Sequence, residues 1–337
     1  MAAMYVESHG NGAQLVMIHG WGMHGGFWDG VVPQLAEQFT VHCVDLPGHG
    51  YSKTLSRLRE RPQALINDRI KPMSPSGSVR LRPPRFALPT CGRGVGERVE
   101  SLRCNKLIGT HTPSPPPLSR QRARGAKSIA CLRFMDRRLE QLDAIVGALS
   151  AQFSGPLNVC GWSLGGLVAL RWAQLAPLQV QRLVVVASTP CFAERKNWLF
   201  GVPAETLRQF SEDMERDHVA MLRRFLTLLV RGGTNERELL ADLRSRLFCH
   251  GQPDINALRG GLEILGEVDF RAELPGITQP ALFIAGECDK LTPPEASKYM
   301  AQALPNARLV KISDAAHVPF LSQPDFFVEQ ITDFLHG

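Results

Sequence analysis

A serine between glycines in the middle of the chain has the residue types and spacing of an enzyme nucleophile. Residues 159–166 read V-C-G-W-S-L-G-G, so Ser163 is the serine of a G-x-S-x-G pattern. The apolar run before it predicts a strand, and the run after it is compatible with a helix. A sharp strand-to-helix turn lifts the serine hydroxyl clear of the sheet, and its flanking glycines avoid a collision with the crossing backbone. We interpret Ser163 as a nucleophile rather than as part of a plain surface turn.

A serine hydroxyl needs a base near neutral pH, and that base needs a carboxylate to orient it. Downstream of Ser163, Asp289 and His317 each follow an apolar run. An acid and then a base at the carboxyl ends of successive parallel strands would lie at the same edge of the sheet as the serine. We therefore predict Ser163, Asp289 and His317 as a catalytic triad. Glu287 is the alternative acid, and His336 is expected at the surface.

An acyl-transfer centre also needs N–H donors for the negative charge that develops on the substrate oxygen. The backbone N–H of Leu164, in the first helical turn after the serine, is one candidate. The second is the N–H of Trp21, in the turn His19-Gly20-Trp21-Gly22 after an early apolar run. His19 itself is interpreted as bracing this turn rather than as a base.

The elements that must position these residues alternate between strands and helices. The strands predicted at 13–18, 40–44, 157–160, 180–187, 280–286 and 307–312 are continuous apolar runs, which is typical of parallel strands covered on both faces. Residues 27–39, 139–149, 294–304 and 325–335 have helical spacing. The expected fold class is therefore α/β, with a mostly parallel, doubly wound sheet.

Two segments depart from this alternation. Residues 53–134 are rich in proline and arginine and have no sustained hydrophobic periodicity, so we interpret them as a disordered insertion. The alternative is a nucleic-acid-binding segment, but such a segment would carry interleaved aromatic residues. Residues 191–265 are amphipathic, and their glycine and proline positions, the last at 260–261, divide them into four short helices of an inserted lid. The core would then comprise three parts, at 1–52, 135–190 and 266–337.

Charge and composition exclude several classes of protein. The formal net charge of +6 comes from one segment, because residues 53–133 contain 18 Lys and Arg against 4 Asp and Glu. The remaining residues carry 20 basic against 28 acidic side chains, so we expect no nucleic-acid partner. No apolar run is long enough to span a membrane, and no secretory signal is evident. The irregular spacing of the eight cysteines favours a reducing cytoplasm, and we expect no metal and no cofactor.

The motifs H-G-x-G, G-x-S-x-G, G-x-x-D and A-x-H, in this order, resemble the α/β-hydrolase superfamily over the chain outside residues 53–133. A narrower resemblance rests on residues 19–22, 45–48, 161–167, 186–192 and especially 260–265 followed by Val268 and Asp269. These segments resemble the family of pimeloyl-acyl-carrier-protein methyl ester esterases of biotin synthesis. One departure is the length between Ser52 and Gly161, which is about three times that expected in the family.

The resemblance implies a serine carboxylesterase that removes a methyl group from pimeloyl-acyl carrier protein. It also implies that Trp21 and Leu164 contact the ester. An acyl channel would be lined by Phe225, Leu226, Thr227, Leu228 and Leu229. Arg224 and Arg237 are our candidates for binding the acidic carrier protein, and we expect a monomer that also accepts small esters.

Other functions share the same motifs and remain open from the sequence. A broad-specificity short-chain carboxylesterase or a carbon–carbon bond hydrolase would use the same triad. A ligand-binding homologue without activity, or one inactivated by the insertion, would also retain these residues.

Overall fold

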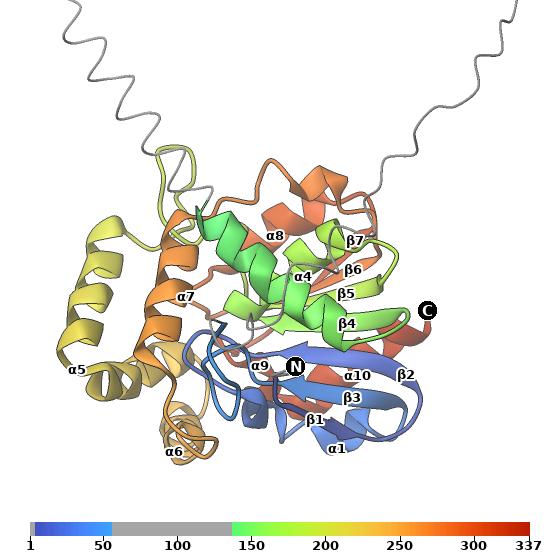
Figure 1. Cartoon of the computed structure of the whole chain (residues 1–337), viewed down its shortest axis with the longest axis horizontal. Helices are drawn as coiled ribbons and strands as arrows, with labels where there is room; N and C mark the ends of the chain where they lie inside the picture. The colour runs from blue at the N-terminus through green and yellow to red at the C-terminus, as the bar shows by residue number, and fades with distance from the viewer. Residues whose placement is uncertain (1–3, 56–136) are drawn as a thin grey trace, which may run out of the picture. The chain divides into compact units, whose positions relative to one another are not determined.

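The computed structural model describes residues 4–55 and 137–337, which contain one seven-stranded sheet (Figure 1). Its strands lie in the order β1-β3-β2-β4-β5-β6-β7, and all neighbours are parallel except β1 and β3. The strands are β1 Val6–His9, β2 Ala13–Ile18, β3 Phe39–Val44, β4 Leu157–Trp162, β5 Val180–Val186, β6 Ala281–Gly286 and β7 Ala307–Ile312. The predicted strands and their parallel arrangement are confirmed, and β1 is an addition that the sequence did not predict.

Helices cover both faces of the sheet. In Figure 1, α4 lies in front of the strands and α10 behind them. The helices of the core are α1 Val32–Leu35, residues 137–152, α4 Leu164–Leu175, α8 Pro294–Ala303, α9 Pro319–Ser322 and α10 Pro324–His336, with 3₁₀ turns η1 Gly25–Trp28 and η3 Leu274–Gly276. The helix predicted over 27–39 is shorter than expected, because η1 and α1 are separate turns on either side of Gly30.

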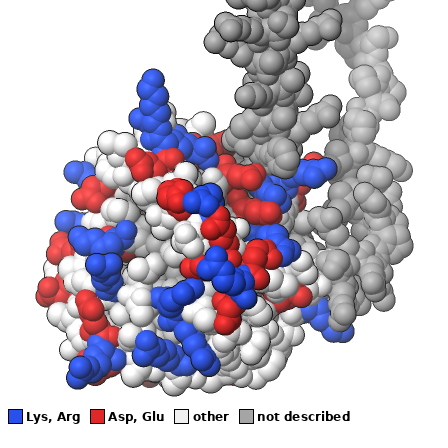
Figure 2. Space-filling model, turned by 90° about the vertical axis from the view of Figure 1, so that its left-hand side faces the viewer, with Lys and Arg blue, Asp and Glu red and all other residues white. Residues whose placement is uncertain are grey.

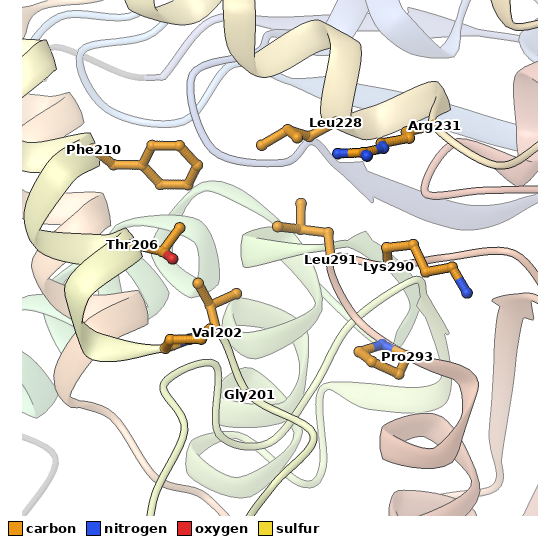
Figure 3. Close-up of a pocket in the computed structure, with 10 residues that line it drawn as sticks. Gly201, Val202, Thr206, Phe210, Leu228, Arg231, Lys290, Leu291 and Pro293 are labelled. Atoms are coloured by element: carbon orange, nitrogen blue, oxygen red, sulfur yellow. The ribbon is translucent and has the colours of Figure 1, made fainter.

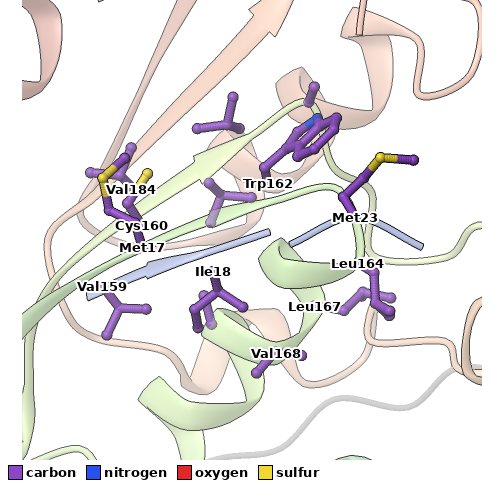
Figure 4. Packing of buried hydrophobic residues seen from close by; sticks show 14 of the residues in the cluster. Met17, Ile18, Met23, Val159, Cys160, Trp162, Leu164, Leu167, Val168 and Val184 are labelled. Atoms are coloured by element: carbon purple, nitrogen blue, oxygen red, sulfur yellow. The ribbon is translucent and has the colours of Figure 1, made fainter. Parts of the chain in front are cut away.

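The central strands are apolar along their whole length because both of their faces are buried. Every residue of β4 and of β6 is buried. Figure 4 shows Ile18 and Val159 packed against Leu167 and Val168 of α4, within one core of buried residues. This close packing fixes the positions of the carboxyl ends of β2 and β4 relative to each other.

The lid, residues 191–265, lies between β5 and β6 in the chain. Its last helix continues for two residues beyond the predicted boundary, to Glu267. Its helices are α5 Ala204–Val230, α6 Glu236–Arg246 and α7 Ile255–Glu267, at the left of Figure 1. Asp217 leaves the helical conformation within α5, and its carboxylate accepts a hydrogen bond from the N–H of Ala220, capping the second half of that helix.

The break predicted at Gly260–Gly261 is wrong, because α7 runs through both glycines. Their lack of side chains serves close packing instead. A Cβ on Gly260 would lie 2.1 Å from Nε2 of Gln141, and one on Gly261 would lie 2.6 Å from Cδ1 of Trp21. The lid helix therefore contacts the core at these two positions.

The predicted division into core, insertion and lid remains a prediction, and its segment 53–134 lies outside the described residues except for positions 53–55. Among the described residues, no helix is long and apolar enough to cross a membrane.

Candidate active site

Ser163 lies at the junction of β4 and α4 in a conformation that few non-glycine residues adopt. Its φ is 55° and its ψ is −116°. A Cβ on Gly161 would be 2.1 Å from the carbonyl oxygen of Gly165, and one on Gly165 would be 2.3 Å from that of Ile18. The collisions predicted for these two glycines are confirmed. Backbone strain of this kind persists only where the surrounding structure maintains it, and it is concentrated at functional sites.

Asp289 and His317 are in direct contact, as the sequence predicts. Nδ1 of His317 lies 2.8 Å from Oδ2 of Asp289, and both residues are buried. Since the carboxylate accepts the Nδ1–H, the lone pair of the neutral ring is on Nε2. Nε2 is buried and has no hydrogen-bond partner among the described residues. This nitrogen is therefore available to accept a proton.

The backbone of His317 is also held at the turn that carries Ser163. The indole N–H of Trp162 donates to the carbonyl of His317 over 2.8 Å, and the two rings are 5.9 Å apart. Because Trp162 directly precedes Ser163, this hydrogen bond holds the His317 loop next to the carboxyl end of β4, where Ser163 lies. The alternative acid, Glu287, instead pairs with Lys311 over 3.2 Å on the surface.

Thr292 also belongs to this cluster, which the sequence did not predict. Its hydroxyl donates to Oδ2 of Asp289 over 2.7 Å and lies 3.2 Å from Nδ1 of His317. The N–H groups of Leu291 and Thr292 donate to the other carboxylate oxygen over 2.8 and 3.0 Å. Four groups thus orient one carboxylate. The position of Thr292 three residues after Asp289, in a tight turn, is the only sequence signal that could have indicated it.

The turn containing Trp21 lies against the strand-to-helix turn that carries Ser163, which we call the elbow. A Cβ on Gly20 would be 3.2 Å from Cβ of Ser163. The backbone N–H groups of Trp21 and Leu164 belong to buried residues and have no acceptor among the described residues. An unpaired buried N–H costs free energy, so two of them beside one serine indicate a place for an external oxygen.

His19 braces this turn, as expected. Its Nδ1–H donates to the carbonyl of Gly20 over 2.7 Å, and its Nε2 accepts from the N–H of Leu46 over 2.9 Å. Burial lowers the pKa of His19 well below its usual value, so the ring is neutral. Both nitrogens are occupied, which removes His19 as a base.

Comparison with known proteins agrees with this geometry. The family model described as the alpha/beta hydrolase fold matches residues 14–324. The chain belongs to the α/β-hydrolase family. The hydrolase also superposes on an esterase from Exiguobacterium antarcticum with a TM-score of 0.68 and 17% identity, over 99% of this chain and 96% of that one.

Two relatives of this hydrolase are named pimeloyl-acyl-carrier-protein methyl ester esterase. The protein of Nitrosomonas europaea is 37% identical over 97% of this chain and 98% of its own length. That of Nitrosospira multiformis is 32% identical over 98% of both chains.

The five residues of α5 that are expected to line an acyl channel do not all lie in one environment in the hydrolase. Phe225 meets Trp21 edge to face, with ring centroids 5.3 Å apart. Leu226 and Leu229 are buried in the core, whereas Thr227 is exposed. Leu228 lines a pocket of about 480 Å³ between the lid and the loop that follows Asp289 (Figure 3).

The two arginines expected to bind a carrier protein both lie on the exposed side of the lid. Arg224 pairs with Asp213 over 3.0 Å. Arg237 has no ion-pair partner among the described residues. Figure 2 shows basic and acidic side chains interspersed over this side of the hydrolase. The structure therefore leaves Arg237 more available than Arg224 for an acidic partner.

Proposed function

We propose that this hydrolase is a serine carboxylesterase that converts the methyl ester of pimeloyl-acyl carrier protein to pimeloyl-acyl carrier protein and methanol for biotin synthesis. The observation that carries the esterase chemistry is the buried contact of Asp289 with His317, which leaves Nε2 of His317 unpaired beside the elbow of Ser163. The choice of substrate is supported by the two relatives with this activity in their names.

In the proposed reaction, Nε2 of His317 removes the proton of Ser163 as its Oγ attacks the ester carbonyl. The N–H groups of Leu164 and Trp21 stabilise the oxyanion, and the loss of one such donor typically costs about 3–4 kcal/mol. The His317 imidazolium then protonates the departing methoxide, which leaves as methanol. Water, deprotonated by the same imidazole, hydrolyses the acyl-enzyme and releases the carboxylate.

The proposed partner is an acyl carrier protein that docks on the outer side of the lid. Arg224 and Arg237 would contact its acidic surface, and Trp21 with Phe225–Leu229 would contact the acyl group. We also propose that the protein acts as a monomer in the cytoplasm and accepts small esters. The absence of disulfides among the five described cysteines fits a reducing compartment.

Two experiments test this proposal, the first on purified protein and the second in living cells. The first measures release of methanol from pimeloyl-acyl-carrier-protein methyl ester and hydrolysis of a short-chain aryl ester. Ser163→Ala should lower turnover by on the order of a millionfold. More than a few per cent of residual activity in this variant would exclude Ser163 as the nucleophile.

The second experiment asks whether the gene restores biotin-free growth to a bacterium that lacks its own pimeloyl-ester esterase. Aryl-ester activity without growth and without methanol release would identify a general esterase instead. An inactive wild-type protein that binds the pimeloyl ester would favour a ligand-binding role.

A further inference from the structure

The pocket between the lid and the Asp289 loop has an apolar wall and a cationic side. Its apolar lining residues are Val202, Pro203, Phe210, Leu228, Leu291 and Pro293. The charged residues of the lining are Arg231 and Lys290. None of the described residues that line the pocket is Asp or Glu. A volume of about 480 Å³ lies in the usual range for small-molecule sites.

The side chains of the two cationic residues point in different directions. Figure 3 shows the guanidinium of Arg231 extending across the pocket towards Leu228 and Leu291, whereas the ammonium of Lys290 points outward at the rim. Neither side chain has an ion-pair or hydrogen-bond partner within the described part of the chain. Most other arginines of α5 and α7 are paired, including Arg208, Arg216 and Arg259. Among residues 4–55 and 137–337, Arg231 is thus a cation beside apolar surface that has no carboxylate partner.

Three connections place this pocket next to the proposed catalytic centre. Lys290 and Leu291 directly follow Asp289 in the chain. The carbonyl of Leu229, the residue after pocket-lining Leu228, accepts from the N–H of His317 over 3.0 Å.

The third connection is a row of aromatic rings. Phe210 of the pocket meets Phe225 with centroids 6.1 Å apart, and Phe225 meets Trp21. Ser163 is not among the pocket-lining residues. The pocket therefore lies next to the Asp289 loop and the backbone of His317 but does not include Ser163, and at this place it can hold a part of the substrate remote from the ester carbonyl.

From this arrangement we infer that the pocket binds the remote part of an ester substrate and that Arg231, assisted by Lys290, binds an anionic group on that part. The inference rests on the proposed esterase function and adds a determinant of specificity to it. A planar guanidinium suits a phosphate or a carboxylate, each of which it can bind through two hydrogen bonds. The anion has two possible sources: the phosphate of a phosphopantetheine arm, and the free carboxylate of a dicarboxylic acid monoester.

The kinetic test compares four methyl esters: dimethyl pimelate, which is neutral, monomethyl pimelate, and the methyl pimeloyl thioesters of pantetheine and of 4′-phosphopantetheine. Arg231→Gln should raise KM about tenfold for a substrate whose anion it binds, the effect of losing about 1.4 kcal/mol of binding. KM for the neutral diester should change less than twofold. Lys290→Gln should act in the same direction with a smaller effect.

Arg216→Gln is the matched control, because it removes the same charge from an exposed position of α5 that does not line the pocket. A selective rise for the phosphorylated thioester identifies phosphate as the ligand, and a selective rise for monomethyl pimelate identifies the carboxylate. An equal rise for charged and neutral esters, or no rise for any of them, overturns the inference.

A binding measurement separates this inference from the proposed function. Calorimetric titration of Ser163→Ala protein with the two thioesters requires no turnover. Binding of the phosphorylated thioester should be about tenfold tighter than that of its dephosphorylated counterpart, and Arg231→Gln should abolish the difference. If the kinetic test points to phosphate but both thioesters bind with the same affinity, the proposed anion site is wrong even where the esterase is active. If the anion preference appears in a protein without hydrolytic activity, the esterase proposal fails and the site remains.

Discussion

Gly261 of α7 lies against the indole of Trp21, so close that a Cβ on the glycine would be 2.6 Å from Cδ1 of the ring. The same indole donates its N–H to the carbonyl of Leu258 over 2.8 Å. One lid helix thereby fixes the side chain of Trp21, whose backbone N–H is our proposed oxyanion donor. The position of that N–H depends on the lid as well as on the core.

We expect Gly261→Ala to lower kcat for all esters by at least tenfold, because the added methyl group displaces Trp21 and with it the proposed oxyanion donor. Overpacking also costs typically 1–3 kcal/mol, so the Tm should fall. Steady-state kinetics and thermal unfolding measure both effects. Gly266→Ala, in the same helix with its nearest neighbouring atom at 4.0 Å, is the control. It should leave kcat unchanged and should not lower the Tm, because alanine favours a helix more than glycine does. Unchanged kcat in Gly261→Ala would show that Trp21 does not need this contact.

Thr292 is predicted to position the Asp289 carboxylate. Thr292→Val removes the hydroxyl that donates over 2.7 Å but retains the shape of the side chain. We expect kcat to fall about 3–10-fold with KM unchanged, since a hydrogen bond to a charged group contributes about 1.5–3 kcal/mol and the other donors to Asp289 remain. Thr292→Ser, which keeps the donor, should restore most of the activity. Equal kinetics in the Val and Ser variants would contradict this role.

The docking role of the lid arginines is tested by reversing charge. Arg224→Glu combined with Arg237→Glu should raise the apparent KM for the carrier-protein ester, and more strongly at low ionic strength, because salt screens exposed charges. Hydrolysis of a small aryl ester should barely change. Arg216→Glu is the matched control, since Arg216 shares Asp213 with Arg224. Equal loss for both substrates would indicate a damaged fold instead.

Stability should fall between pH 6.5 and pH 4 because buried histidines must stay neutral in the folded protein. Burial lowers the pKa of His24 and of His49 to about 4, from 6.5. Below pH 6.5 the unfolded chain binds protons that the folded chain excludes until pH 4, so the stabilisation is complete above 6.5 and is lost as the pH falls.

The expected loss between pH 7 and pH 5 is about 2 kcal/mol for each of these histidines. Urea unfolding at the two pH values measures it. His49→Gln should reduce the difference between them. A free energy of unfolding that is equal at pH 7 and pH 5 would show that these rings are protonated in the folded protein.

The strands, their parallel direction and the places of Ser163, Asp289 and His317 after them follow from local patterns. Continuous apolar runs such as 280–286 bury both faces of a strand, and residues placed directly after such runs collect at one edge of the sheet. The contact of Asp289 with His317 was therefore predictable although 28 positions separate them.

The path of the lid was only partly predictable. Glycine pairs usually interrupt helices, which is why a break was expected at 260–261. Packing of α7 against Trp21 and Gln141 overrides that preference, because only glycine leaves room for both side chains. Likewise, no glycine or proline indicates the kink at Asp217, which depends on its own carboxylate capping the following turn.

The sequence alone thus determined the fold class and the residues able to form a triad, since both depend on local periodicity and chain order. Tertiary structure alone decided that Thr292 joins Asp289, that Trp21 is held by the lid, and that Arg231 and Lys290 share an apolar pocket. Lys290 and Arg231 are far apart in the chain, on a core loop and at the end of α5, and neither position has a pattern of its own. Such pairs are set by how the lid packs on the sheet, and packing depends on the shapes of many side chains at once.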